Sequence, residues 1–355
     1  MNLRDHGIEF GIFPTTDRNH ICDIDGVELG HVTLNEGKDI HTGITVIKPH
    51  AGDVVKEKVL AGFYRGNGYG KFAGSTQIEE TGLLESYIGL TNTLAVGTVL
   101  QELVRHHVTE QNDPDLISLN VPVGETNDAY LNNIASLPIK PEHVHEALAD
   151  LSADNVAQGN LGAGTGTVAF GFKGGLGSAA RVIPKEFAKT DRDYKIGVLM
   201  QSNYGGFLKL KGTDLWPELG KNRFEAELKA MEESKGSCCM LIATDAPFLP
   251  RTLERFARRA VAGLVGTGSF ISHGSGDYAL AWSTAIKQEP TGTKELQPHI
   301  EGKFLSEYSV DPFFQAIVEC VEECLWNSMT NAETVEGHRK TIEKVPVEKV
   351  LELVK

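Results

Sequence analysis

The residues with the clearest chemical potential are Gly236 and Ser237, which stand directly before an apolar run at positions 238–244. Glycine has no Cβ, so the peptide can take a strained shape in which the Ser237 hydroxyl reaches the Gly236 carbonyl. An N→O acyl shift followed by hydrolysis would leave Ser237 as a new N-terminus. Its amine, with an ordinary pKa of about 7.7–8.0, can then serve as the base for its own hydroxyl. On the dipeptide alone, a simple turn before a strand is the commoner explanation.

Glycine is the most unusual component of the composition, with 38 residues concentrated at positions 62–74, 159–177 and 263–276. Two of these segments contain G-x-G-x-G, but neither continues as the G-x-G-x-x-G dinucleotide fingerprint. Gly70-Lys71 resembles the end of a P-loop, yet Phe72 replaces the required Ser or Thr. Nucleotide binding is therefore disfavoured. Two explanations stay open: positive φ in tight turns, or backbone N–H groups that a substrate approaches closely.

No other catalytic or metal-binding pattern is complete. The twelve histidines form no H-E-x-x-H motif and join no Cys or carboxylate at ligand spacing. No G-x-S-x-G surrounds Ser237 or Ser275, which excludes the α/β-hydrolase elbow. Cys320 and Cys324 lie four apart on a predicted helix and are expected to be small core residues. We expect no metal and no organic cofactor.

The elements that must position these residues alternate between strand and helix along the chain. Apolar, β-branched runs predict strands at 44–47, 116–123, 167–172, 195–201, 238–244 and 278–284. Apolar residues at spacings of three and four predict helices at 93–107, 141–151, 250–264 and 311–325, the last with Asp311 as its cap and Pro312 in its first turn. The charged segment 221–235 reads as a solvated helix or a surface linker. This mixed order predicts a layered α/β or α+β domain.

Charge and length limit the possible partners and location. The chain has 34 Lys and Arg against 48 Asp and Glu, a formal net charge of −14, which argues against a general binder of nucleic acid or anionic membranes. No apolar run approaches the length of a membrane span, and the first ten residues contain no signal-peptide core. The odd number of cysteines, five, does not indicate a disulfide framework. We expect a soluble, cytoplasmic protein.

Longer motifs in a fixed order extend over nearly the whole chain. They occupy positions 23–33 with 42–45, 66–68, 78–82 with 90–93, 162–166 with 172–181, and 236–247. In that order they resemble the L-aminopeptidase/D-esterase and β-peptidyl aminopeptidase family, self-processing hydrolases with an N-terminal serine. The resemblance implies a four-layer αββα sandwich, similar to the N-terminal nucleophile hydrolases but with different connectivity. It also implies one domain over 1–355, cleavage between Gly236 and Ser237 into 1–236 and 237–355, and a homo-oligomer, by analogy a tetramer.

The same resemblance implies roles for individual residues. Ser237 matches the nucleophile, and Asn203 matches the asparagine that donates to the oxyanion. Ser275 and Asp277 match a Ser-Gly-acid element, in which the serine sits beside the nucleophile and the acid orients it or takes part in proton transfer. Glu125 matches the carboxylate that holds the free amine of the substrate.

The sequence also departs from the family. Asn127 stands where some relatives carry an aromatic residue of the oxyanion pocket, and Tyr130 is expected to take over part of that role. Cys238 and Cys239, bulkier than expected after the nucleophile, are interpreted as packing residues on opposite faces of a strand.

The implied reaction is hydrolysis of the N-terminal residue of small peptides, amides or esters through an acyl-enzyme on Ser237. An endo-amidase or an acyltransferase on the same scaffold is the first alternative, although the acetyltransferase relatives use threonine as nucleophile. An unprocessed, non-catalytic binding protein is the second. The sequence does not distinguish L-, D- and β-residues at the substrate's N-terminus.

Overall fold

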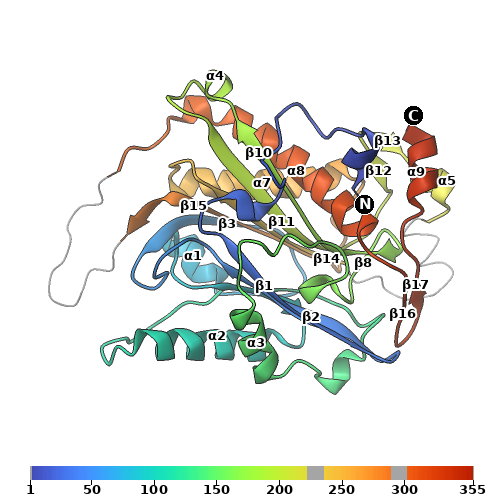
Figure 1. Cartoon of the computed structure of the whole chain (residues 1–355), viewed down its shortest axis with the longest axis horizontal. Helices are drawn as coiled ribbons and strands as arrows, with labels where there is room; N and C mark the ends of the chain where they lie inside the picture. Colours follow the sequence, from blue (N-terminus) through green and yellow to red (C-terminus); the bar gives the residue numbers. More distant parts are fainter. Residues whose placement is uncertain (1, 222–235, 289–301, 355) are drawn as a thin grey trace.

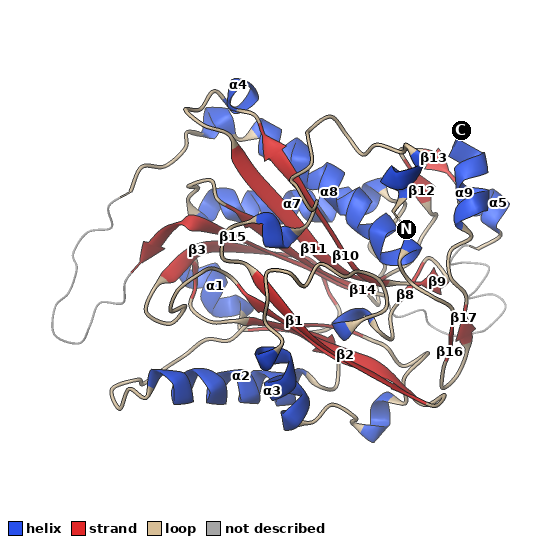
Figure 2. Ribbon diagram, viewed as in Figure 1, coloured by secondary structure: helices blue, strands red, loops and turns tan. Residues whose placement is uncertain are grey.

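Two β-sheets lie face to face, with helices on the outer face of each, in a computed structural model that describes residues 2–221, 236–288 and 302–354 (Figures 1 and 2). Three hydrophobic clusters separate the four layers. One lies between the first sheet and its helices, one between the two sheets, and one between the second sheet and its helices. The layered α/β prediction and the αββα order are therefore confirmed.

The first sheet has six strands in the order β10-β11-β14-β15-β3-β5. Their bounds are β10 (Gly175–Ile183), β11 (Tyr194–Asn203), β14 (Ser237–Thr244), β15 (Gly276–Gln288), β3 (Lys58–Gly68) and β5 (Leu83–Leu84). β14 and β15 run parallel, and the other pairs are antiparallel. All eight residues of β14 are buried. Met240 and Ile242 face the helices while Leu241 and Ala243 face the second sheet, as expected for a central strand covered on both faces.

Two long helices, α7 (Pro250–Gly266) and α8 (Asp311–Thr330), cover this sheet. Each starts with a proline in its first turn, where the missing N–H costs no hydrogen bond. Asp311 is already the first helical residue and Val310 is the cap, one position from the prediction. Cys320 and Cys324 are fully buried on α8, which confirms that they are core residues.

The second sheet has five strands in the order β1-β2-β6-β7-β4. The bounds are β1 (Glu28–Glu36), β2 (Ile40–Lys48), β6 (Ile88–Asn92), β7 (Val123–Thr126) and β4 (Phe72–Ala73). Its outer face is covered by α2 (Val96–Gln111) and α3 (Pro141–Ala149). The parallel pair β6 and β7 is joined through α2, the usual crossover between parallel strands.

Short elements complete the described chain. The short helices are η1 (Leu3–His6), η2 (Ile21–Asp23), α1 (Ser75–Thr81), η3 (Ile134–Ser136), η4 (Gly162–Gly164), α4 (Lys185–Ala188), α5 (Trp216–Leu219), η5 (Glu307–Ser309) and α9 (Val347–Val354). The short strands are β8 (Val168–Ala169), β9 (Phe172–Lys173), β12 (Lys209–Leu210), β13 (Thr213–Asp214), β16 (Val335–Glu336) and β17 (Thr341–Ile342).

Two strand predictions need correction. Residues 116–122 are irregular and only Val123 of that run belongs to a strand, because Pro122 lacks an N–H and the Asn120 backbone bonds instead to the side chains of Ser86 and Glu85. Residues 167–172 do not form one strand but hold the β8–β9 turn, whose backbone has positive φ at Phe170 and Gly171. The predicted charged segment 221–235 lies outside the described residues except for Lys221.

The glycines of segment 159–177 allow close packing of backbone against backbone. A Cβ on Gly177 would lie 1.8 Å from the carbonyl oxygen of Cys324, and one on Gly175 would lie 2.3 Å from that of Gly159. The buried ammonium of Lys173 ties the segment together by donating to the carbonyl oxygens of Gly164 and Gly174, at 3.0 and 2.8 Å, and to that of Thr167 at 2.9 Å. This cluster is therefore mainly structural, and the nucleotide-loop interpretation finds no support in it.

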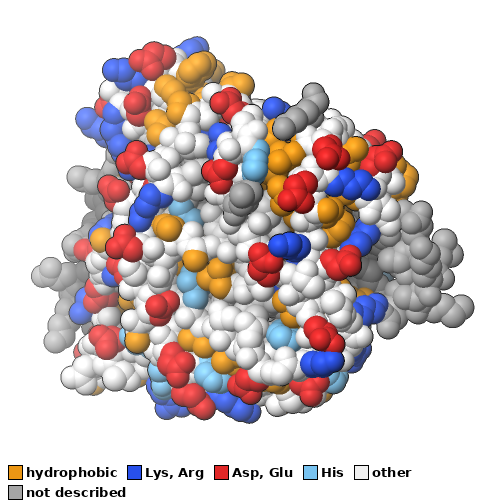
Figure 3. Space-filling view, turned by 45° about the vertical axis from the view of Figure 1, so that its right-hand side comes forward, with side chains coloured by type: hydrophobic (Ala, Val, Ile, Leu, Met, Phe, Trp, Pro, Cys, Tyr) orange, Lys and Arg blue, Asp and Glu red, His pale blue; other side chains and the backbone are white. Residues whose placement is uncertain are grey.

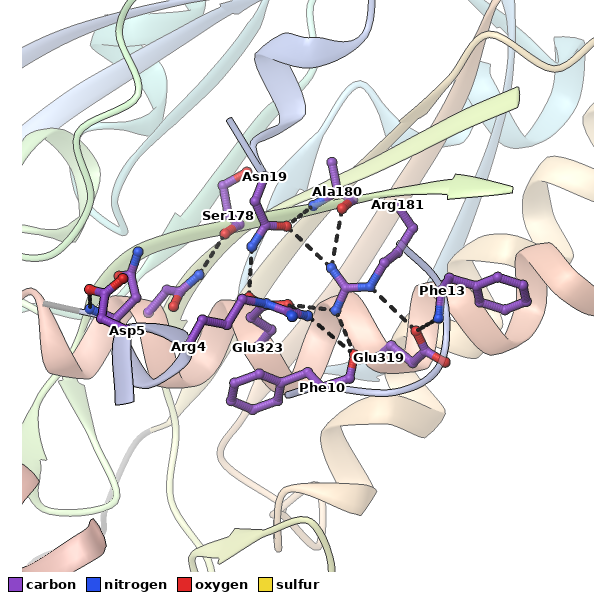
Figure 4. Close-up of polar contacts among 12 residues, drawn as sticks. Arg4, Asp5, Phe10, Phe13, Asn19, Ser178, Ala180, Arg181, Glu319 and Glu323 are labelled. Atoms are coloured by element: carbon purple, nitrogen blue, oxygen red, sulfur yellow. Dashed lines mark hydrogen bonds and ion pairs between the residues drawn. The ribbon is translucent and has the colours of Figure 1, made fainter. Parts of the chain in front are cut away.

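A buried ionic network fastens the N-terminal segment to β10 and α8 (Figure 4). Arg181 is fully buried and pairs with Glu323 at 2.5 Å and Glu319 at 3.3 Å. Arg4 approaches Glu323 from the other side at 2.5 Å, and Asn19 donates to the same carboxylate at 2.7 Å. Because each carboxylate oxygen is met by donors, this network is a satisfied structural cluster.

The surface carries both signs of charge. On the face shown in Figure 3, acidic and basic side chains are interspersed over the whole area. No helix in the described ranges is long and apolar enough to cross a membrane.

Candidate active site

Ser237 is the first residue of β14 and lies in the middle of the six-stranded sheet, between two other strands. It pairs with Asn203 at the end of β11 and with Gly276 at the start of β15. The side chain is buried, and its hydroxyl donates to the carbonyl oxygen of Gly236 at 2.7 Å and accepts the Gly276 N–H at 3.3 Å. The hydroxyl is thus held against the peptide bond between Gly236 and Ser237.

Asn203 presents its side-chain amide beside Ser237. Its Oδ1 accepts the Val168 N–H at 2.9 Å, and its Nδ2 donates to the Asn127 carbonyl oxygen at 3.1 Å. Together the two bonds fix which end of the amide is the donor. Among the described residues only one of the two Nδ2 N–H bonds has a partner, so the other could stabilise a negative oxygen that develops near Ser237.

Ser275 and Asp277 flank Gly276 and are both buried. Burial raises the pKa of Asp277 to about 6, and the Ser275 hydroxyl offsets part of that rise. Asp277 is aligned with Cys238, whose side chain belongs to the cluster on the helix face, whereas Ser237 shares the opposite face with Cys239. The Asp277 side chain is therefore on the opposite face of the sheet from Ser237, and within the described ranges no hydrogen bond joins the two. The side chain that interacts with the Asp277 carboxylate is Ser275.

Glu125 lies in β7 of the second sheet, and its carboxylate is almost completely buried. Its Oε1 accepts the backbone N–H of Lys71 at 2.9 Å and lies 3.6 Å from the Lys71 ammonium. Burial raises the pKa of Glu125, and the Lys71 charge opposes that rise. Gly70 makes this approach possible, because a Cβ there would lie 2.5 Å from Oε1.

Cys239 connects Glu125 to β14, the strand that begins with Ser237. Its thiol lies 3.4 Å from the Glu125 carbonyl oxygen, across the space between the sheets. It is two residues after Ser237 on the same face, so Glu125 and Ser237 line one end of that space. Burial raises the pKa of both Cys238 and Cys239 well above the ordinary value, which makes them poor thiolate nucleophiles. The prediction that they pack on opposite faces is confirmed.

Asn127 and Tyr130 follow β7. The Asn127 carbonyl oxygen contacts Asn203, but its side-chain Oδ1 accepts the Ala129 N–H at 3.0 Å and so stabilises its own turn. The Tyr130 ring lies under the Lys340 ammonium, 4.6 Å from its centroid. That Tyr130 takes over part of the aromatic residue's role in the oxyanion pocket stays a prediction.

Lys71 is the residue of this site that the sequence reasoning missed. Its one signal in the sequence is its position after Gly70, where the dipeptide resembles the end of an incomplete P-loop. In the described part of the chain, no cluster of three or more His, Cys, Asp or Glu side chains is arranged to hold a metal ion.

Comparison with known proteins places this arrangement in a family. Residues 19–342 match peptidase family S58. The chain belongs to peptidase family S58. Its curated relatives include the beta-peptidyl aminopeptidase BapA of Sphingosinicella xenopeptidilytica, 35% identical over 352 residues that cover 94% of this chain and 86% of the relative. The family resemblance of the motifs is confirmed.

Two solved structures have the same fold as this chain. The L-aminopeptidase D-Ala-esterase/amidase from Ochrobactrum anthropi, described as a new variant of the Ntn-hydrolase fold, matches with a TM-score of 0.90 and 30% identity, covering 99% of this chain and 98% of the other. A protein from Pyrococcus horikoshii OT3 matches with a TM-score of 0.88 and 39% identity over 99% and 98% of the two chains. As a member of family S58 with these aminopeptidase relatives, the chain is a peptide hydrolase.

Proposed function

We propose that this S58 peptidase is a self-processing aminopeptidase and amidase, whose nucleophile is Ser237 after cleavage of the Gly236–Ser237 bond. The observation that carries the proposal is the 2.7 Å contact between the Ser237 hydroxyl and the Gly236 carbonyl oxygen, on a fully buried strand between Asn203 and Gly276. A serine that merely ends a turn before a strand would not need its hydroxyl to be buried beside the side-chain amide of Asn203.

Self-cleavage begins with attack of Ser237 Oγ on the Gly236 carbonyl carbon. The peptide C–N bond breaks as the ester forms, and the nitrogen takes up the hydroxyl proton and becomes the Ser237 amine. Water then hydrolyses the ester, which releases the Gly236 carboxylate and restores the hydroxyl. The products are chains of 236 and 119 residues. Glycine fits at position 236 because a Cβ there would lie only 3.2 Å from the backbone Cα of Tyr204.

Peptide hydrolysis repeats the chemistry on a bound substrate. Glu125 binds the substrate's ammonium, Ser237 attacks the scissile carbonyl with its own amine as base, and the free N–H of Asn203 Nδ2 stabilises the oxyanion. The leaving amine takes the proton, and water hydrolyses the acyl-enzyme. By the family resemblance Ser275 lies beside Ser237, and through it Asp277, ionised above a pH of about 6, would accept the proton from the Ser237 amine.

Glu125 distinguishes this reading from an endo-amidase. Although the Lys71 ammonium lies 3.6 Å from Oε1, burial still raises the pKa of Glu125, so a second cation would further stabilise its charged form. A substrate with a free ammonium supplies that cation, whereas an N-acetylated one does not. We therefore propose that N-blocked analogues are poor substrates.

The homo-oligomer implied by the family resemblance, by analogy a tetramer, stays a prediction. Size-exclusion chromatography with light scattering would test it.

Intact mass and N-terminal sequencing test the proposal. The wild-type chain is expected to yield two fragments, one beginning at Ser237, and to hydrolyse aminoacyl p-nitroanilides. Ser237→Ala is expected to stay one chain of 355 residues without activity. The matched control is Ser283→Ala on β15, a buried serine that also donates to a backbone carbonyl oxygen. Cleavage or turnover in Ser237→Ala would exclude the nucleophile, and an uncleaved but folded wild type would favour the non-catalytic binding protein.

A further inference from the structure

The cation nearest to the amine-binding carboxylate is supplied by the chain itself. Lys71 places its ammonium 3.6 Å from Glu125 Oε1 and also donates to the Thr93 hydroxyl. Glu125 has 3% of its side chain exposed, whereas Lys71 has 48%. The carboxylate thus forms the floor of the site and Lys71 stands at its open side.

A bound substrate must share this carboxylate with Lys71. Its ammonium would enter beside a lysine ammonium that is already present, and two cations that share one almost fully buried carboxylate repel each other. The repulsion disappears if the substrate brings an anion close to its own amine. Since Glu125 Oε1 and Lys71 Nζ are only 3.6 Å apart, the two substrate charges must also be close, as they are when one carbon carries both.

We propose that this enzyme prefers N-terminal residues whose free amine and a free carboxylate sit on the same carbon, and specifically β-aspartyl residues, with Lys71 as the specificity-determining residue. The inference rests on the proposed function. In a β-aspartyl residue the scissile carbonyl is one methylene away from the carbon that carries both charges. The residue is therefore a β-amino acid, which agrees with the name beta-peptidyl aminopeptidase of two curated relatives.

Each substrate group then has a partner in the chain. The ammonium binds Glu125, the α-carboxylate binds Lys71, and Ser237 attacks the β-carbonyl. The amide C–N bond breaks as the Ser237 ester forms, and the leaving amine takes the hydroxyl proton. Water hydrolyses the ester and releases free aspartate with the restored hydroxyl, so no further reactant is needed.

Two chromogenic substrates isolate the carboxylate. Aspartic acid β-p-nitroanilide and 3-aminobutyric acid p-nitroanilide have the same chain length and amine position, but the second has a methyl group where the first has the carboxylate. We expect kcat/KM of the processed wild type to be about tenfold or more higher for the first substrate, since one charge-assisted hydrogen bond distinguishes them.

Substitution of Lys71 tests the assignment. Lys71→Met is expected to lower kcat/KM for the aspartyl substrate by about 10- to 100-fold while leaving or raising that for the methyl substrate, and Lys71→Arg should retain the preference. The matched control is Lys287→Met, another half-exposed lysine, paired with Glu57 near the far end of β15. It should change neither value.

The outcomes separate the two hypotheses. If the processed enzyme hydrolyses the methyl substrate equally well, or if Lys71→Met affects both substrates alike, this inference is wrong while the proposed function stands. A stronger preference for the α-p-nitroanilide of aspartate would also overturn it, because that substrate holds its carboxylate on a separate carbon. Turnover of neither substrate by a chain without a Ser237 N-terminus would overturn both.

Discussion

Buried carboxylates in two regions of this molecule differ in how completely they are paired. Around Arg181, the carboxylates of Glu319 and Glu323 meet guanidinium groups and backbone N–H donors (Figure 4). At the candidate active site, burial raises the pKa of Asp277 to about 6 and also raises that of Glu125. Neither oxygen of Asp277 has a hydrogen bond of good geometry among the described residues.

The difference separates a structural role from a chemical one. Charges that hold elements together are stable only when fully paired, since an unpaired charge in the interior is expensive. Carboxylates that must bind a cation or exchange a proton have to leave some of their hydrogen-bonding and ion-pairing capacity unused. This costs stability and shifts their pKa toward neutral pH. The comparison predicts that damage to the first cluster unfolds the protein, whereas damage to the second changes rates in a folded one.

The largest effect is expected from Arg181→Met. It leaves two buried carboxylates without their shared guanidinium, so the free energy of unfolding should fall by about 3–5 kcal/mol, as when one partner of a buried pair is removed. Urea denaturation monitored by circular dichroism measures it. The control Arg192→Met removes a guanidinium that is half exposed and pairs with Asp245 at 2.9 Å, and should cost less than about 1 kcal/mol. Equal losses in the two variants would contradict the comparison.

Asn203→Ala should instead leave the fold intact and slow the reaction. Loss of one oxyanion donor costs about 10²–10³ in kcat, or about 2.7–4 kcal/mol of transition-state stabilisation. Steady-state kinetics on purified, processed protein measures this effect. Asn327→Ala is the control, because Asn327 is also buried and donates to a backbone carbonyl, that of Ser178, far from Ser237 in the chain. A rise in KM with unchanged kcat for Asn203→Ala would assign Asn203 to substrate binding.

Much of the fold was predictable because its signals are local. The central strand β14 shows an apolar run on both faces, and α7 and α8 show a proline start followed by a regular apolar stripe. Predictions failed where a side chain competed with the backbone, as at Asn120 and Pro122, or where positive φ at Phe170 turned an apolar run into a hairpin. Apolar content alone does not report such turns.

The site was predictable only in part. The motifs marked Ser237, Asn203 and Glu125, and these three do lie around one end of the space between the sheets. Periodicity carries no sign of Lys71, because its contact with Glu125 joins residues 54 apart in the chain through the geometry of β4 and β7. Long-range electrostatic pairs of this kind follow from the tertiary fold and not from local sequence.

The pH dependence of Asp277 provides a smaller but directional test. Its native pKa of about 6 lies above the unfolded value of about 3.9, so the native state binds more protons between these values. Its contribution to stability is therefore complete below about pH 4 and is lost as the pH rises through about 6. Activity should move the opposite way: below pH 6, kcat/KM should fall by about a further tenfold per pH unit beyond the fall set by the Ser237 amine, if ionised Asp277 accepts the proton.

Asp277→Asn should remove both trends. The difference between wild type and variant isolates this residue from the buried histidines, whose pKa values burial lowers from 6.5. Measurements are kcat/KM and the free energy of unfolding from pH 4 to 8. If the additional fall in activity below pH 6 persists in a variant with residual turnover, another group is the proton acceptor.

The smallest effect is expected from Gly70→Ala, which disturbs the proposed amine site at Glu125 without removing any charge. The new Cβ would lie 2.5 Å from Glu125 Oε1, on a backbone with φ of +150° that residues with a side chain rarely adopt. The carboxylate must shift, so KM should rise several-fold while kcat changes less, since Ser237 and Asn203 keep their positions. Gly212→Ala is the control for backbone strain, because Gly212 also has positive φ, +79°, but a Cβ there meets nothing within 4 Å. If both variants lose only stability, Gly70 serves the turn and not the carboxylate; a KM effect confined to Gly70→Ala would show that Glu125 is held ready for the substrate's amine by the space this glycine leaves.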